Sequence, residues 1–171
     1  MANSHRLLNY QIKIYCPTGD SDRGIGTGHV SIEPGLLYHN RIGDGPWSID
    51  GELKLWVPIS DVQADPGTGL EDFAGPVVRY GLGVGYDIFE NRCRDRRLTG
   101  VAEFVGWTVI DGLKTDPGAT VLDASGDTIV NGKFGLRFTS GRHTFYGGYA
   151  KALTGHVWYD ELIRAEYGIS F

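Results

Sequence analysis

The chain has 171 residues, of which 41% are hydrophobic, and this is enough to build one domain. Its net charge of −5 argues against a nucleic-acid surface, and no run of about 18 apolar residues exists that could form a transmembrane helix. The 26 glycines and the aromatic content of 12% favour an all-β class.

Eight candidate strands follow one another, each marked by alternation of apolar and polar residues between turn signals. Their expected ranges are 7–16, 29–39, 47–59, 77–88, 98–109, 129–139, 144–153 and 159–171. Most have the length that a tilted strand needs to cross a hydrocarbon layer, and long connections alternate with short ones. The pattern predicts a single domain over 1–171, an antiparallel up-and-down transmembrane β-barrel of eight visible strands, with a fragment of a larger barrel as the alternative.

The final strand shows the alternation most clearly, because one of its faces stays apolar up to the aromatic residue Phe171. Barrel strands turn apolar residues toward lipid and polar residues toward the lumen. A terminal aromatic of this kind is also the feature through which we expect the barrel-assembly machinery to recognise the chain. The side chains expected to face the membrane are Ile12, Leu53, Leu82, Phe134, Leu136, Ile163, Tyr167, Ile169 and Phe171.

Charged residues lie opposite the apolar face in most strands. Turning the sixth strand over would bring Lys133 and Arg137 into lipid, at about 2–4 kcal/mol for each charge near the midplane. The charges expected inside are Lys13, Glu33, Glu52, Lys54, Arg79, Asp87, Glu103, Lys133, Arg137, Lys151, Arg164 and Glu166. Both signs occur in a lumen only wide enough for side chains, so we expect an ion-paired plug and not an open pore.

Two alternatives remain open. A soluble lipocalin-like barrel would reverse the facing of the same residues and bind a small apolar ligand. An outer-membrane lipid hydrolase would use His29, Ser31 and Glu33, although these three share one strand face at period 2. A polar network is the simpler interpretation of the three residues, so we expect no enzyme activity.

Other motifs have structural explanations. Gly81, Gly83 and Gly85 sit within a strand and open no helix, so they do not form a phosphate loop and instead make room for a large side chain such as Trp56 or Arg79. No Cys/His set has metal-ligand spacing, and we expect no cofactor. A surface Ca²⁺ site remains an alternative for the loop aspartates, whose own turns explain most of them: Asp20, Asp22, Asp61, Asp65, Asp72, Asp116, Asp123 and Asp127.

Two further features concern the ends of the barrel. Cys16 and Cys93 should lie at opposite ends and remain unpaired. A basic turn carries four arginines, for which a solvated surface is the default interpretation and contact with anionic lipid or the periplasmic wall is the alternative: Arg92, Arg94, Arg96 and Arg97.

Several short segments, taken together, make the chain resemble outer-membrane barrels of the MetA-pathway phenol-degradation family. The similar segments are Pro17-Thr18-Gly19, Glu33-Pro34-Gly35, Arg79-Tyr80-Gly81-Leu82-Gly83-Val84-Gly85-Tyr86-Asp87, Gly106-Trp107-Thr108-Val109, Ala152-Leu153-Thr154-Gly155 and Arg164-Ala165-Glu166-Tyr167-Gly168-Ile169-Ser170-Phe171. The resemblance implies an outer-membrane barrel that takes up small hydrophobic or aromatic compounds, and it implies no catalytic residue. Members of the family carry a signal peptide and more strands, whereas the opening residues here lack the apolar segment of a signal.

Overall fold

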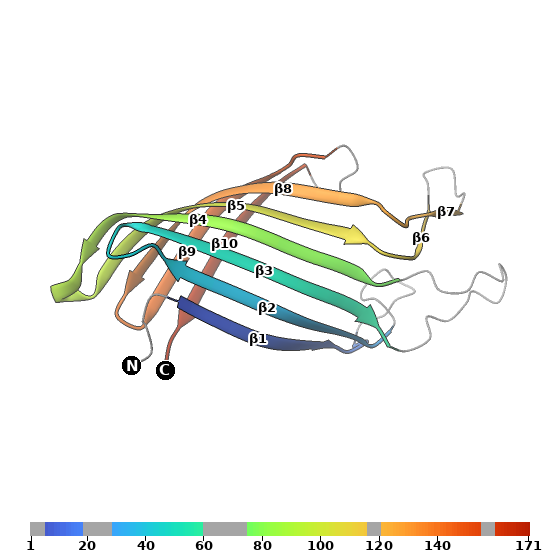
Figure 1. Ribbon diagram of the computed structural model, residues 1–171, viewed down its shortest axis with the longest axis horizontal. Coiled ribbons are helices and arrows are strands. Elements are labelled where there is room, and N and C mark those ends of the chain that lie inside the picture. The colour runs from blue at the N-terminus through green and yellow to red at the C-terminus, as the bar shows by residue number, and fades with distance from the viewer. Residues whose placement is uncertain (1–5, 19–28, 60–74, 116–120, 155–159) are drawn as a thin grey trace.

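One antiparallel sheet of eight strands dominates the computed structural model, which describes residues 6–18, 29–59, 75–115, 121–154 and 160–171 (Figure 1). The strand order is β1-β2-β3-β4-β5-β8-β9-β10. The strands are β1 Arg6–Tyr15, β2 Ser31–Arg41, β3 Trp47–Pro58, β4 Val77–Asn91, β5 Arg96–Val109, β8 Thr128–Ser140, β9 His143–Ala152 and β10 Glu161–Ile169. The predicted all-β class and the order of its strands are confirmed.

Two smaller elements were not predicted. The long connection between β5 and β8 contains a hairpin of β6 (Leu113–Thr115) and β7 (Val121–Asp123). A short 3₁₀ turn, η2 (Arg92–Arg94), joins β4 to β5, and the Asn91 side chain accepts a hydrogen bond from the Arg94 backbone N–H there. In the described part of the chain, no helix is both long enough and apolar enough to span a membrane.

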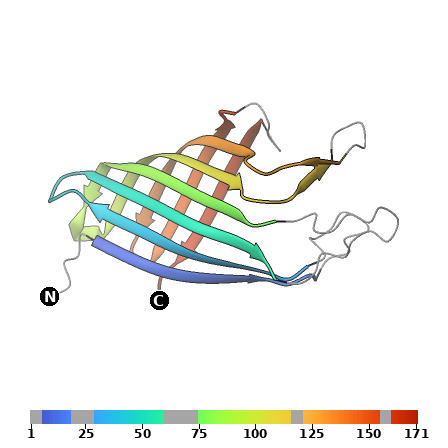
Figure 2. The same ribbon diagram turned by 45° about the vertical axis from the view of Figure 1, so that its right-hand side comes forward.

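The sheet curls strongly, but it does not close. β1 and β10 are its two edges and do not pair with each other, so the closed barrel expected from the sequence is present as a half-barrel. The start of β1 and the end of β10 lie at the end of the sheet that carries the short turns (Figures 1 and 2).

The registers show how the two edges are offset. A row of directly opposed residues that begins at Leu8, near the start of β1, passes across all eight strands and ends at Glu161, at the opposite end of the sheet. A stagger of this kind accompanies strand tilt in barrels. It also means that the edges can meet only if β1 pairs with residues well beyond Glu161 in β10.

The two faces of the sheet differ in chemistry. On the convex face of β8, Phe134 and Leu136 are 64% and 53% exposed, and Ile163 of β10 reaches 84%. The concave face carries the charged residues and a small apolar core of Val101 and Ala150. Alternate residues of a strand point to opposite faces, so this division follows directly from the period-2 pattern of the sequence.

The fifth predicted strand, β5, fits the same division, although its sequence places Glu103 on the same face as valines. Glu103 lies directly opposite Lys133 on the concave face, which it shares with Val101 and Val105. The convex side of β5 is mostly small, and the Tyr80 ring of β4 lies over Gly106, where a Cβ would come within 2.7 Å of it. The neighbouring strands therefore supply the apolar surface that β5 lacks.

Candidate functional site

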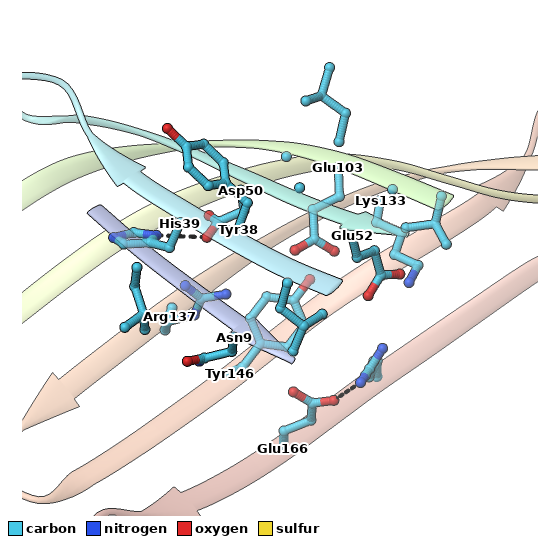
Figure 3. Close-up of a pocket in the computed structure, with 18 residues that line it drawn as sticks. Asn9, Tyr38, His39, Asp50, Glu52, Glu103, Lys133, Arg137, Tyr146 and Glu166 are labelled. Atoms are coloured by element: carbon cyan, nitrogen blue, oxygen red, sulfur yellow. Dashed lines mark hydrogen bonds and ion pairs between the residues drawn. The ribbon is translucent and has the colours of Figure 1, made fainter. Parts of the chain in front are cut away.

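The concave face encloses one cavity of about 340 Å³ to which every strand of the sheet contributes (Figure 3). Its lining includes Asn9, Leu37, Asp50, Glu52, Gly83, Glu103, Lys133, Arg137, Tyr146, Arg164 and Glu166. Because β1 and β10 both contribute, the two open edges face a common space.

Glycines on β4 make this space available. A Cβ at Gly81 would lie 2.8 Å from the Glu52 Cγ, and one at Gly85 would lie 2.4 Å from the Ser48 Oγ. The predicted packing role of the glycines is therefore present, but the proposed partners, Trp56 and Arg79, were wrong. Polar side chains of β3 and β5 occupy the cleared surface because they lie directly opposite the glycines in the registers.

Opposite charges meet within the cavity. His39 Nδ1 lies 2.7 Å from Asp50 Oδ1 (Figure 3). Glu52, which lines the cavity, also forms an ion pair with Lys54. On β10, Arg164 pairs with Glu166 two residues along the same face. The cavity wall is thus polar and carries both signs, which suits water or a small polar solute better than an apolar one.

A second cluster lies nearer the long-connection end. The Glu33 side chain is fully buried, and its Oε2 accepts a hydrogen bond of 2.7 Å from Arg79 Nη1. Its Oε1 lies 3.4 Å from Lys13 Nζ on β1. One carboxylate therefore joins three strands, β1, β2 and β4, and offsets two cations that both keep partial contact with solvent.

A third cluster closes the short-turn end. Arg41 Nη2 lies 3.1 Å from both Asp87 Oδ2 and Glu90 Oε2. Thr99 donates a hydrogen bond of 2.7 Å to the other oxygen of Asp87. The hydrogen bond from Arg41, reinforced by its positive charge and that of Arg92, lowers the pKa of the Glu90 carboxyl below its ordinary value of 4.5, against a smaller effect of desolvation.

One charge expected in the lumen lies elsewhere. Lys151 is directly opposite Gly132 on one side and Glu161 on the other, and this row belongs to the convex face. It therefore shares a face with Phe145 and Tyr149, contrary to the expectation. The strand ends one residue later, so Lys151 sits at the rim, where a cation need not enter the apolar belt. The other residues of the expected lumen set lie on the concave face.

The residues proposed for a hydrolase do not form a catalytic arrangement. Ser31 is fully buried, and its Oγ has no hydrogen-bond partner among the described residues. His29 packs edge-on against Trp56 with ring centroids 5.4 Å apart, and Glu33 is committed to Arg79. A nucleophile needs a base within hydrogen-bond reach, and no such contact joins Ser31 to His29.

Metal and disulfide expectations can be compared only for the described residues. Within them, no group of three or more His, Cys, Asp or Glu side chains could hold a metal ion. Asp123 accepts a hydrogen bond from the Ser125 N–H, as its own turn requires, and six of the eight loop aspartates lie outside the described residues. Cys16 and Cys93 are both free and exposed, as predicted.

Sequence reasoning missed three members of the cavity wall. His39 and Asp50 were not paired with each other, although both lie on the polar face and equally far from the centre of the turn, between Asp44 and Gly45. Tyr146, whose ring lies beside Gly135 and Gly148, was also missed. Counting the same number of residues outward from the centre of this turn on both strands would have placed His39 opposite Asp50.

In comparisons with known proteins, this chain matches no family model, no curated protein and no solved structure. Its function must therefore be inferred from the geometry of its two faces.

Proposed function

We propose that this chain is an integral outer-membrane β-barrel protein without enzymatic activity, which serves passive transport of small compounds or a structural role. The observation that carries the proposal is the contrast between the faces. Large apolar side chains stand exposed on every strand of the convex face, while paired charges line the concave one. In water this would leave an apolar patch far larger than soluble monomers tolerate, whereas a bilayer would cover it.

A soluble lipocalin-like barrel is less well supported. That fold would bury its apolar residues around an apolar ligand, but the cavity here is lined by Glu52, Glu103 and Lys133. The concave face also buries Glu33 between two cations, where a lipocalin-like interior would be apolar. Charge burial without a partner is costly, so these residues belong to a polar lumen.

The proposal requires the two edges to be paired in the membrane, because each unpaired backbone group in hydrocarbon costs several kcal/mol. Setting Lys13 of β1 opposite Glu166 of β10 keeps Ile12 and Tyr167 on the convex side and places opposite charges together. Sliding β1 by two residues would set Lys13 against Arg164 or Gly168 instead. We propose the register with Glu166, since like charges directly opposite each other destabilise a sheet.

Cysteine pairs test this closure. In a variant with Cys16→Ser and Cys93→Ser, the proposed register places Tyr10→Cys directly opposite Ile169→Cys, at a separation that permits a disulfide. We expect rapid cross-linking in proteoliposomes, read as a gel shift. The control pair, Tyr10→Cys with Tyr167→Cys, lies on the same face but out of register and should link more slowly. Equal rates, or dimers only, would refute the intramolecular seam.

Membrane insertion itself is tested by flotation. The protein should need detergent to remain monodisperse, and after reconstitution it should float with liposomes and resist extraction at alkaline pH. A monodisperse protein in plain buffer that stays in the soluble fraction would contradict the proposal.

Transport is tested separately from insertion. Proteoliposomes should be assayed for entry of a small polar solute and of a small aromatic compound, beside protein-free liposomes. The charged lining supports faster entry of the polar solute, whereas the family resemblance implies uptake of the aromatic one. If neither enters faster than in protein-free liposomes, the structural role is retained and passive transport is rejected.

A further inference from the structure

The short-turn end of the sheet carries a group of arginines outside the cavity. The arginine tip, defined here as Arg92, Arg94, Arg96 and Arg142, belongs to the β4–β5 turn and the adjacent β8–β9 turn. The Gly141 N–H donates a hydrogen bond of 2.9 Å to the Asp95 carbonyl and so joins the two turns. All four arginines are exposed.

Most of the positive charge of the arginine tip is not neutralised by a nearby carboxylate. Arg92 Nε lies 3.4 Å from Glu90 Oε1, and Asp95 contributes one carboxylate at the same tip. Arg94, Arg96 and Arg142 form no ion pair with another described residue. The nearby acids Asp87 and Glu90 are engaged by Arg41 on the concave side. An excess of positive charge therefore remains at the rim.

The position of the tip relative to the apolar face indicates what it meets. A continuous row of apolar residues crosses five strands at this end of the convex face: Phe89, Leu98, Phe138, Phe145 and Tyr167. Arg96 lies two residues beyond Leu98 on the same face, which is about 7 Å along the strand. The headgroup layer on each side of a bilayer is roughly 5–8 Å thick. The tip therefore falls at the depth of lipid phosphates.

We propose that the arginine tip binds the phosphate groups of anionic phospholipids in the leaflet on the side of the two termini. This inference rests on the proposed membrane insertion and deepens it by naming a lipid class. Guanidinium groups suit phosphate because their N–H donors can bind two oxygens at once. The opposite rim offers no matching excess among the described convex residues, because Lys151 faces Glu161 across β9 and β10.

The two native cysteines provide a local probe and its control. Cys93 lies within the arginine tip, and Cys16 follows β1 at the other end of the sheet. A fluorophore is attached to Cys93 in a Cys16→Ser variant, or to Cys16 in a Cys93→Ser variant. Each protein is reconstituted in phosphatidylcholine vesicles containing a small fraction of nitroxide-labelled phosphatidylglycerol or nitroxide-labelled phosphatidylcholine, and quenching is compared.

At Cys93 we expect labelled phosphatidylglycerol to be preferred by about fivefold or more, the effect expected of one basic side chain near an anionic surface. The preference should disappear when Arg94, Arg96 and Arg142 are replaced by Gln, and Cys16 should show none. An equal preference at both labels, or a preference that survives the three substitutions, would overturn the lipid site.

Two other results separate the possible failures. If the protein does not enter vesicles, both the proposed function and the lipid site are refuted. If it enters but Cys93 shows no preference, only the lipid site is refuted. Inorganic phosphate at millimolar concentration should leave the quenching unchanged, and loss of the preference at that concentration would reassign the tip to a soluble anion.

Discussion

The convex and concave faces of this sheet are built from alternate residues of the same strands, yet one exposes large apolar side chains and the other carries paired charges. On the convex face, Phe134 and Leu136 stand exposed with no protein partner layer above them. On the concave face, Glu33 is fully buried between two cations. This difference supports the proposal that something apolar covers the convex side while water or paired charges fill the concave side.

The largest effect should follow from placing a charge on the convex face. Ile12→Arg brings a cation into the apolar belt of β1 and should reduce the free energy of unfolding in lipid by about 2–4 kcal/mol. The matched control is its neighbour, Gln11→Arg, which lies on the concave face. Denaturant titration in vesicles measures both variants. Equal losses at the two positions would contradict the assignment of the faces.

The next effect concerns the buried carboxylate. Glu33→Gln removes a charged partner from both Arg79 and Lys13, and should destabilise the protein by roughly 1.5–3 kcal/mol, the range for hydrogen bonds to charged groups. The cations retain some solvent contact, which keeps the loss below that of a fully buried pair. Adding Arg79→Gln and Lys13→Gln should recover part of the loss. A variant as stable as the original protein would argue against the cluster.

A smaller effect separates two glycines of the convex face. Gly106→Ala must displace the Tyr80 ring and should cost about 1–2 kcal/mol through overpacking, unless the ring can rotate away. Gly147→Ala meets nothing within 4 Å and should be neutral or slightly stabilising. Thermal unfolding of both variants in the same detergent makes the comparison. Identical melting temperatures would show that Tyr80 does not rest on Gly106.

The smallest effect is a pH dependence at the rim. The pKa of Glu90 is lowered in the folded protein, so its contribution to stability is complete above its ordinary pKa of 4.5 and is lost as the pH falls through the lower folded pKa. Arg41→Gln should weaken the dependence of stability on pH in this acidic range. Unfolding midpoints measured between about pH 3 and 6 test this, and parallel profiles would contradict the role of Arg41.

The alternation of residues was enough to predict the strands and most of the face assignments. In a strand with one strongly apolar face, such as β8, only one orientation puts the charged residues on the concave side and the apolar residues on the convex side. Lys151 was misassigned because one face of β9 carries both aromatic residues and this lysine. A residue at the end of a strand can also lie at the rim on either face. The partners of Gly81 and Gly85 were misassigned for a different reason, since they depend on how β3 and β5 align with β4.

Two features lay beyond sequence reasoning altogether. The open edges at β1 and β10, and the stagger between them, emerge only when the registers of all the strands are combined, and no single strand encodes them. The bridge from Glu33 to Arg79 crosses from β2 to β4 and depends on sheet curvature that brings non-adjacent strands together on the concave side. Local patterns determine which face a residue occupies, but not which distant residue it meets there.

The central claim, that the convex face meets lipid, is tested most directly by spin labels placed one at a time along residues 130–138 of β8 in reconstituted vesicles. The account predicts that labels at even positions, such as Phe134 and Leu136, collide mainly with lipid-soluble oxygen. Labels at odd positions, such as Lys133 and Arg137, should collide mainly with a water-soluble nickel complex. Alternation of the opposite phase, or no alternation at all, would contradict the claim.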